Sequence, residues 1–186
     1  MSLRVAIVSD THGRLDPRIA SLVAECDLAV HAGDIGSASV LAGLAPRDGR
    51  VLAVTGNNDL PGKWPEEDRQ LLAGLPAELD LHLPGGTLTL IHGHQVPARR
   101  RHAWLRARFP ASRAVVYGHS HRLAIDRDGW PWILNPGAAG RARTYGGPSC
   151  LVLAAAKAGW VVDEHRFRLP ERPRKGPLSG QQRIVL

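Results

Sequence analysis

The sequence is poor in cysteine and has no long apolar run, and each absence excludes a class of protein. Its two cysteines, Cys26 and Cys150, are far apart and outside any metal-binding spacing, so we expect buried thiols in a reducing compartment rather than a disulfide framework. The apolar stretch at residues 3–8 is too short for a signal peptide, and no segment approaches the roughly 20 apolar residues of a membrane span. We therefore predict a soluble cytoplasmic protein without a membrane partner.

Aromatic residues are also scarce, at 5% of the chain, which leaves few surfaces on which nucleobases could stack. The formal net charge is nevertheless +7, and arginine, whose planar guanidinium binds phosphate oxygens, supplies nearly all the cations. The densest cluster is Arg99–Arg101, at the start of a helix predicted over 98–108. In that helix Ala103, Trp104 and Ala107 are expected to face the core. The outward arginines either attract a nucleotide or nucleic-acid phosphate or form a solvated helix face, so nucleic-acid binding is an open alternative.

The order of predicted elements changes along the chain. Apolar, β-branched runs predict strands over 3–9, 27–32 and 51–55, alternating with helices over 16–25 and 37–45, which is typical of a parallel sheet. Asp16 is suited to cap the first helix and Pro17 to form its first turn. A short helix between breaks is expected within 60–76. Further strands and hairpins are predicted over 78–83, 87–91, 114–117, 122–127, 131–135, 149–155 and 160–167.

Parallel units first and hairpins later predict an α/β fold in which two packed mixed β-sheets are flanked by helices, a four-layer αββα sandwich. With 186 residues and 44% hydrophobic composition, the chain is long enough to bury one core, and we expect a single domain over 1–169. Residues 170–186, with several prolines and glycines, predict an irregular C-terminal extension.

Five of the apolar runs end in side chains that bind metal ions. Open α/β sheets place ligands just outside the carboxyl ends of their strands, so these side chains are expected to converge on one crevice. Carboxylate, imidazole and amide groups, with no cysteine among them, are typical of a site for divalent cations. The candidates, in chain order, are Asp10 and His12, Asp34, Asn57 with Asn58 and Asp59, His92 with His94, and His119 with His121.

In order and type these motifs resemble the calcineurin-like metallophosphoesterases, and the spacing is similar to their small single-domain bacterial and archaeal phosphodiesterase branch. The resemblance covers about residues 3–167. Asn135-Pro136-Gly137, after the last ligand pair, is also similar to that branch. The motifs are Asp10-x-His12, Gly33-Asp34, Gly56-Asn57-x-Asp59, His92 and Gly118-His119-x-His121.

The resemblance implies a site for two metal ions with Asp34 bridging them. One ion would be held by Asp10, His12, Asp34 and His121, and the other by Asp34, Asn57, His92 and His119. Asp59 is expected to support the ligands from outside the coordination shell. The metal is expected to be Mn²⁺, with Fe, Ni, Zn or Co as alternatives. A water shared by the ions would lose a proton, and the resulting hydroxide would attack phosphorus.

One position departs from the family pattern. Many members carry histidine where this chain has Asn58, and asparagine cannot donate a proton to a leaving group. Asn58 and His94 are expected to contact the substrate, and His94 is the candidate to protonate the leaving oxygen. A surface or supporting histidine is the other interpretation of His94. Ser9 and Ser120 have no triad around them and are not expected to be nucleophiles.

These motifs predict a dinuclear-metal-dependent phosphodiesterase acting on a small or nucleotide-like phosphodiester. The alternatives are a phosphomonoesterase or nuclease using the same site, or a non-enzymatic scaffold of the same fold. Because every ligand position is filled, the sequence favours the enzyme over the scaffold. A homo-oligomer is compatible with the sequence.

Overall fold

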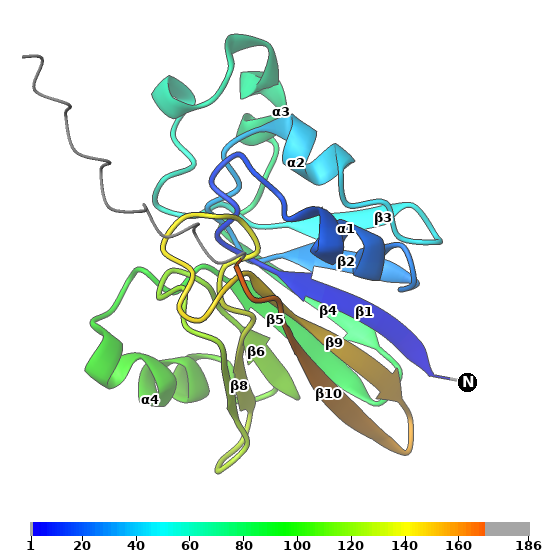
Figure 1. Cartoon of the computed structure of the whole chain (residues 1–186). Helices are drawn as coiled ribbons and strands as arrows, with labels where there is room; N and C mark the ends of the chain where they lie inside the picture. Colours follow the sequence, from blue (N-terminus) through cyan, green and yellow to red (C-terminus); the bar gives the residue numbers. More distant parts are fainter. Residues whose placement is uncertain (1, 170–186) are drawn as a thin grey trace, which may run out of the picture.

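The strand β1 (Leu3–Val8) shows how the sequence forms layers. Its side chains alternate between two apolar environments: Val5 and Ile7 pack in a core shared with a second sheet, whereas Ala6 and Val8 pack beneath a helix. A strand that is apolar on both faces has to be covered on both faces. The structure, a computed structural model that describes residues 2–169, meets this requirement with two sheets face to face and helices outside them (Figure 1).

The first sheet has the strand order β10-β9-β1-β2-β3. β2 (Leu28–His31) and β3 (Arg50–Ala53) run parallel to β1, and α1 (Pro17–Val23) connects β1 to β2. On the other side of β1 lies an antiparallel hairpin of β9 (Ser149–Ala156) and β10 (Gly159–Arg166). The last strands of the described chain therefore complete the sheet that the first strands begin.

The second sheet has the order β4-β5-β6-β8-β7, and its three inner strands are parallel. Antiparallel partners, β4 and β7, form its two edges. The strands are β4 (Glu78–Leu83), β5 (Gly86–Ile91), β6 (Ala114–Val116), β7 (Ala124–Asp126) and β8 (Trp132–Asn135). Each of the two sheets thus contributes three parallel strands whose carboxyl ends carry loops.

Apolar clusters account for the four layers. The largest lies between the sheets and includes Ile7, Leu90 and Leu153, all fully buried. Outside the first sheet, α1 covers β1 with its buried residues Ile19 and Val23. Outside the second sheet lies the longest described helix, α4 (Ala98–Arg108). These contacts confirm the predicted αββα sandwich.

The segment between β3 and β4 covers the edge of the first sheet. α2 (Ala38–Ala42) precedes β3, and two 3₁₀ turns (Pro61–Lys63 and Glu66–Asp68) lead into α3 (Arg69–Ala73). Trp64, Val40 and Leu72 pack against Ala53 of the edge strand. The broken helix predicted within 60–76 is therefore present and has a packing role.

The other predicted elements are also present, and three of them are shorter than predicted by three residues or more. The first helix covers 17–23 instead of 16–25, because the chain turns directly after it: Glu25 N donates to Leu22 O and Cys26 N to Val23 O before β2 begins at Leu28. Asp16 caps this helix, as predicted, by accepting from Arg18 N at 3.0 Å. The second helix shortens to 38–42 and the strand predicted over 122–127 shortens to 124–126. No helix among the described residues is long and apolar enough to cross a membrane, and the predicted extension at 170–186 lies outside them.

The buried face of α4 differs from the prediction. Ala103 and Ala107 are exposed, Trp104 is half-buried, and Arg101 and Leu105 are the buried positions. Leu105 can remove more apolar surface from water than an alanine can, so the helix turns its leucine toward the second sheet. The predicted core face was therefore wrong by about one residue position.

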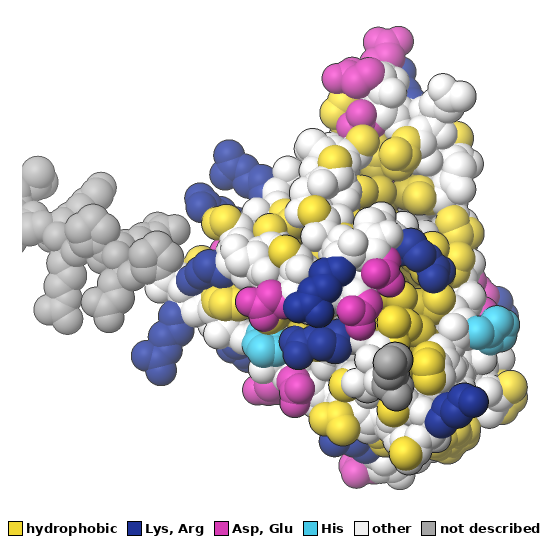
Figure 2. Space-filling model, turned by 90° about the vertical axis from the view of Figure 1, so that its right-hand side faces the viewer, with side chains coloured by type: hydrophobic (Ala, Val, Ile, Leu, Met, Phe, Trp, Pro, Cys, Tyr) yellow, Lys and Arg dark blue, Asp and Glu magenta, His cyan; other side chains and the backbone are white. Residues whose placement is uncertain are grey.

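The arginines of this helix do not form one basic patch. Arg99 and Arg100 are exposed, whereas Arg101 is buried with its guanidinium over the ring of Tyr117. Further along, Arg106 pairs with Asp126 at 2.6 Å. On the face of the molecule shown in Figure 2, basic and acidic side chains are likewise interspersed. The net positive charge is distributed and partly neutralised by acidic neighbours.

Candidate metal centre

Five loops that carry the predicted ligands begin at the carboxyl ends of five parallel strands: β1, β2 and β3 in the first sheet, and β5 and β6 in the second. Backbone hydrogen bonds join neighbouring loops beyond the strand ends. Asp10 N donates to Gly33 O at 3.0 Å, and His12 N donates to Asp34 O at 2.9 Å. Across the two sheet edges, His119 N donates to Asp10 Oδ1 at 3.2 Å. Ligands separated by about a hundred residues are thereby brought together.

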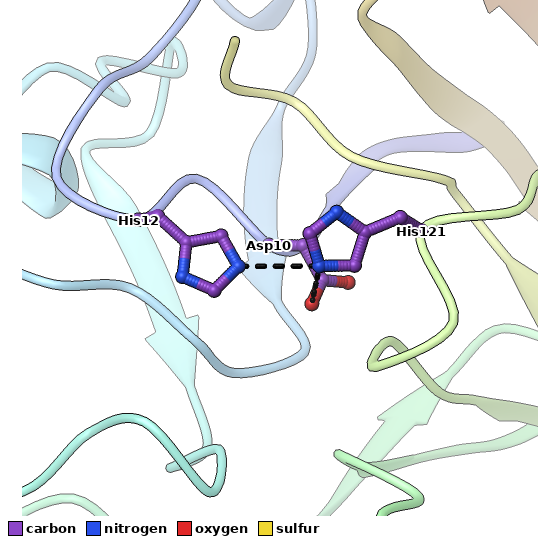
Figure 3. A group of neighbouring side chains, drawn as sticks. All are labelled: Asp10, His12 and His121. Carbon is purple, nitrogen blue, oxygen red and sulfur yellow. Dashed lines mark hydrogen bonds and ion pairs between the residues drawn. The ribbon is translucent and has the colours of Figure 1, made fainter. Parts of the chain in front are cut away.

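Asp10, His12 and His121 form the first group of side chains that could hold a metal ion. His121 Nε2 lies 3.2 Å from Asp10 Oδ1 and 3.2 Å from His12 Nε2, and Figure 3 shows these polar atoms facing one another. Asp10 and His121 are buried, while His12 is half-buried and open to solvent. The group combines one carboxylate with two imidazoles, a donor set that suits a divalent transition-metal ion.

Asp34 links this group to a second one made of Asp10, Asp34 and His92. Its Oδ2 lies 3.4 Å from His92 Nε2 and 3.7 Å from His12 Nε2. Burial opposes ionisation of Asp34, but contact with His92 and hydrogen bonds from Asn58 outweigh it and hold the pKa of this carboxyl well below its usual range. The carboxylate is therefore ionised. It lies near an imidazole of each group, whereas Asp10 is the residue that belongs to both groups.

Asn57 and His119 lie together beside the second group. Asn57 Oδ1 and His119 Nδ1 are 2.9 Å apart, and the rings of His119 and His92 are edge to face at 5.4 Å. Burial and the nearby charges of His92 and Arg101 lower the pKa of His119, which keeps this imidazole neutral. A neutral imidazole is the form that binds a metal ion.

Backbone carbonyls fix the orientation of two of the histidines. His92 Nδ1 donates to Ala32 O at 2.8 Å, and His121 Nδ1 donates to Ala142 O at 3.0 Å. The proton on Nδ1 leaves a lone pair on Nε2 of each ring, directed toward the carboxylates. The sequence motifs predicted the candidate ligands but gave no indication of these supporting carbonyls.

The donor set fits a bound cation. His92 Nε2 is buried and has no hydrogen-bond partner among residues 2–169, although it lies 3.4 Å from Asp34 Oδ2. The His121 Nε2 lone pair likewise faces a carboxylate oxygen of Asp10. Lone pairs that face anionic oxygens in a buried site repel one another unless a cation lies between them. That cation is a proton when no metal is bound, since despite burial the contact with Asp34 raises the pKa of His92, and a metal ion can take its place. The residues present therefore match the requirements of divalent metal ions.

The backbone of the ligand loops is strained in a consistent way. Six non-glycine residues of the described chain have positive φ, and five of them are candidate ligands: Asp10, His12, Asp34, His119 and His121, with φ between 48° and 63°. Such left-handed residues cost about 1–3 kcal/mol each and persist where the surrounding structure enforces them, commonly at functional sites. The strain is confined almost entirely to the positions that face one another.

Asp59 joins two ligand loops without facing the metal groups. Its carboxylate accepts from Ile35 N at 2.9 Å and from Gly36 N at 3.1 Å in the Asp34 loop. It also accepts from Gly56 N at 2.8 Å and from Trp64 Nε1 at 3.0 Å. These contacts support the predicted role of Asp59 as a residue that holds ligand loops in place.

Asn58 is engaged by its neighbours. Its Nδ2 donates to Asp34 Oδ2 at 2.8 Å, and its Oδ1 accepts from Lys63 Nζ at 2.7 Å. Lys63, which the sequence motifs did not single out, lines a cavity of about 200 Å³ together with Asn58 and Asp34. That cavity is lined by His12, Asp34, Gly36, Asn58, Asp59 and Lys63.

His94 and His102 lie in different surroundings, the first beside the candidate metal groups and the second away from them. His94 is exposed, with its ring 5.6 Å from His92 and 6.2 Å from His119, so it borders the second group. His102, outside any motif, bridges Asp126 Oδ2 at 2.6 Å and Tyr117 Oη at 3.0 Å, and it ties α4 to the second sheet. The first is positioned to contact a ligand, whereas the second has a structural role.

The αββα sandwich, with a cluster of carboxylates and imidazoles at its strand ends, is the arrangement of a metal-binding protein with a phosphoesterase fold. The sequence matches the calcineurin-like phosphoesterase superfamily domain over residues 3–158, and the chain belongs to this family. None of the curated proteins compared with the chain gives a significant sequence match.

Solved structures show the same fold at low sequence identity. A single mutant of Vps29 from Entamoeba histolytica has a TM-score of 0.67 and 18% identity, over 89% of this chain and 100% of that one. The wild-type Vps29, solved in complex with Zn²⁺, has a TM-score of 0.63. A predicted phosphoesterase from Streptococcus pneumoniae has a TM-score of 0.65 and 21% identity, over 89% and 90% of the two chains. An archaeal phosphodiesterase has a TM-score of 0.63 and 20% identity, over 88% and 100%.

Proposed function

We propose that this protein is a phosphodiesterase that depends on two divalent metal ions, with Mn²⁺ as the expected metal. The observation that carries the proposal is the convergence of Asp10, Asp34, His92 and His121 from four separate loops, with the unpartnered Nε2 of His92 facing a carboxylate. Family membership and a phosphodiesterase of the same fold support the reaction class. The Zn²⁺ bound to a Vps29 of this fold supports metal binding.

Each ligand has a defined part in the proposal. Asp10, His12, Asp34 and His121 hold one ion, and Asp34, Asn57, His92 and His119 hold the other. When bound, the ions neutralise charge on the phosphoryl oxygens and lower the pKa of water at the site to near neutrality. The single bridging carboxylate and the neutral Asn57 oxygen keep the total ligand charge low, which preserves the positive charge that the reaction requires. Asp59 and the Ala32 and Ala142 carbonyls keep the ligands oriented.

Metal removal tests the proposal. Purified protein should contain bound divalent metal, lose hydrolysis of bis-p-nitrophenyl phosphate after chelation, and regain it when Mn²⁺ is added. Elemental analysis before and after chelation gives the metal content. The phosphodiesterase proposal fails if protein reloaded with two equivalents of metal does not hydrolyse the diester. Turnover of p-nitrophenyl phosphate above that of the diester would instead favour the monoesterase alternative.

The side chains present bear on the scaffold and nuclease alternatives in different ways. Vps29 shares the fold, but in this chain every expected ligand position carries a metal-binding side chain. For nucleic acid, the buried Arg101 and the paired Arg106 weaken the basic patch suggested by the sequence. Binding of fluorescent single-stranded DNA at physiological salt, measured by anisotropy, separates the nuclease alternative from a small-molecule diesterase.

His94→Ala should slow hydrolysis most for substrates with poor leaving groups. His94 is exposed beside His92 and His119. Asn58, which stands where many family members carry histidine, cannot donate a proton to the leaving group. We expect about a 10²-fold fall in kcat for an alkyl phosphodiester and a small change for bis-p-nitrophenyl phosphate, whose leaving group needs no proton. Equal effects on both substrates would show that His94 is not the acid.

A further inference from the structure

Arg143 reaches the metal centre from a loop that none of the metal-binding motifs includes. The loop follows β8, the third parallel strand of the second sheet, and is the yellow segment between β8 and β9 in Figure 1. Asn135 at the end of β8 donates to Gly118 O at 2.9 Å, which ties the start of this loop to the loop of His119 and His121. β8 is the one parallel strand of the two described sheets that carries no predicted ligand, and its loop therefore also reaches the site.

Two contacts hold Arg143 against a candidate ligand. His121 Nδ1 donates to Ala142 O at 3.0 Å, and Arg143 Nη2 donates to His121 Nε2 at 3.2 Å. An imidazole nitrogen has one lone pair, so the guanidinium and a metal ion cannot share this atom. Metal binding by His121 therefore releases a guanidinium, with its five N–H donors, at the rim of the centre.

The backbone of Arg143 has the same left-handed conformation as the candidate ligands. With φ of 52° it is the sixth non-glycine residue with positive φ in the described chain, and the other five are candidate ligands. Arg143 is exposed, so no core packing enforces this conformation. A strained arginine at the solvent side of a cationic centre is suited to an anionic ligand, because its planar fork matches the oxygens of a phosphate.

We propose that Arg143 binds a non-bridging oxygen of the phosphoryl group held at the metal centre, which makes it a substrate-binding residue of the phosphodiesterase. The assignment depends on the proposed function for its substrate, but the contact itself requires only a phosphate anion and bound metal. The competing role is purely electrostatic: Arg143 would serve as a counter-ion to Asp10 and Asp34 when no metal is bound.

Binding of inorganic phosphate to the metal-loaded protein tests the assignment. Arg143→Gln should weaken phosphate binding in isothermal titration by about 10- to 100-fold and lower kcat/KM for bis-p-nitrophenyl phosphate to a similar extent, at unchanged metal content. Arg143→Lys should retain part of both. Arg141→Gln, an equally exposed arginine of the same loop, is the matched control and should stay within about twofold of the wild type.

The outcomes separate this inference from the proposed function. Phosphate binding and turnover within twofold of the wild type in Arg143→Gln would overturn the assignment. Metal loss in that variant would also overturn it, because Arg143 would then act by positioning His121. If loaded wild-type protein binds phosphate but cleaves no diester, the proposed function fails while the titration still decides whether Arg143 holds the anion.

Discussion

Asp34→Asn should reduce metal-dependent hydrolysis of bis-p-nitrophenyl phosphate by about 10³-fold in kcat/KM, equivalent to about 4 kcal/mol of transition-state stabilisation. Asp34 Oδ2 lies within 3.7 Å of the Nε2 atoms of both His12 and His92, so its carboxylate is the one expected to contact both proposed metal ions. An amide of the same shape provides one neutral oxygen and cannot bridge two cations. Elemental analysis should show the loss of at least one metal ion per chain.

The fold should survive this substitution. Asp10 and Asp34 offer oxygens that lie within one candidate metal group, so their charges repel each other when no cation is bound. The Asp34 carboxylate also accepts from Asn58 N and Nδ2, both at 2.8 Å, and an amide cannot keep both bonds. In chelator, Asp34→Asn should therefore melt cooperatively but somewhat below the wild type, and the wild type should gain more stability when metal is added. Asp163→Asn, the same change at an exposed position of β10, should alter neither property. Full activity of Asp34→Asn at normal metal content would refute the bridging role.

The sequence predicted the layers of the fold because periodicity reports burial directly. β1 is apolar at every position from Val5 to Val8, which implies cover on both faces, and the structure provides it with the second sheet and α1. The prediction for α4 was wrong because Ala103, Trp104 and Ala107 are apolar but small or only partly buried. Leu105 instead defines the buried face, together with the aliphatic stem of Arg101.

The candidate ligands could be predicted from the sequence because chemistry fixes their residue types and topology fixes their position at strand ends. What holds them could not be found in this way. The carbonyls of Ala32 and Ala142 can belong to any residue, so no side-chain pattern marks them. Arg143 follows the last motif in a loop without secondary structure, and its approach to His121 depends on a backbone conformation that sequence does not specify.

Gly118→Ala should damage the metal centre without removing any ligand. A Cβ at this position would collide with Ser9 Oγ and come within 2.7 Å of Asp10 Oδ2 and 3.1 Å of Ala32 O. The φ of Gly118 lies outside the left-handed region, so the effect is one of space and not of backbone strain. Because Ser9 Oγ also donates to Asp10 Oδ2 at 2.8 Å, the added methyl group displaces the carboxylate together with its hydrogen-bond donor.

The expected result is a loss of about 1–3 kcal/mol in the free energy of unfolding from overpacking, and metal binding weakened by about 10- to 100-fold because the ligand has lost its support. Chemical denaturation and metal titration measure the two effects separately. Gly159→Ala is the matched control, since a Cβ there meets no atom within 4 Å, and it should change neither. Wild-type metal affinity in Gly118→Ala would mean that the Asp10 carboxylate can shift and still bind, and that the close approach of the β1 and β6 loops does not set the geometry of the centre.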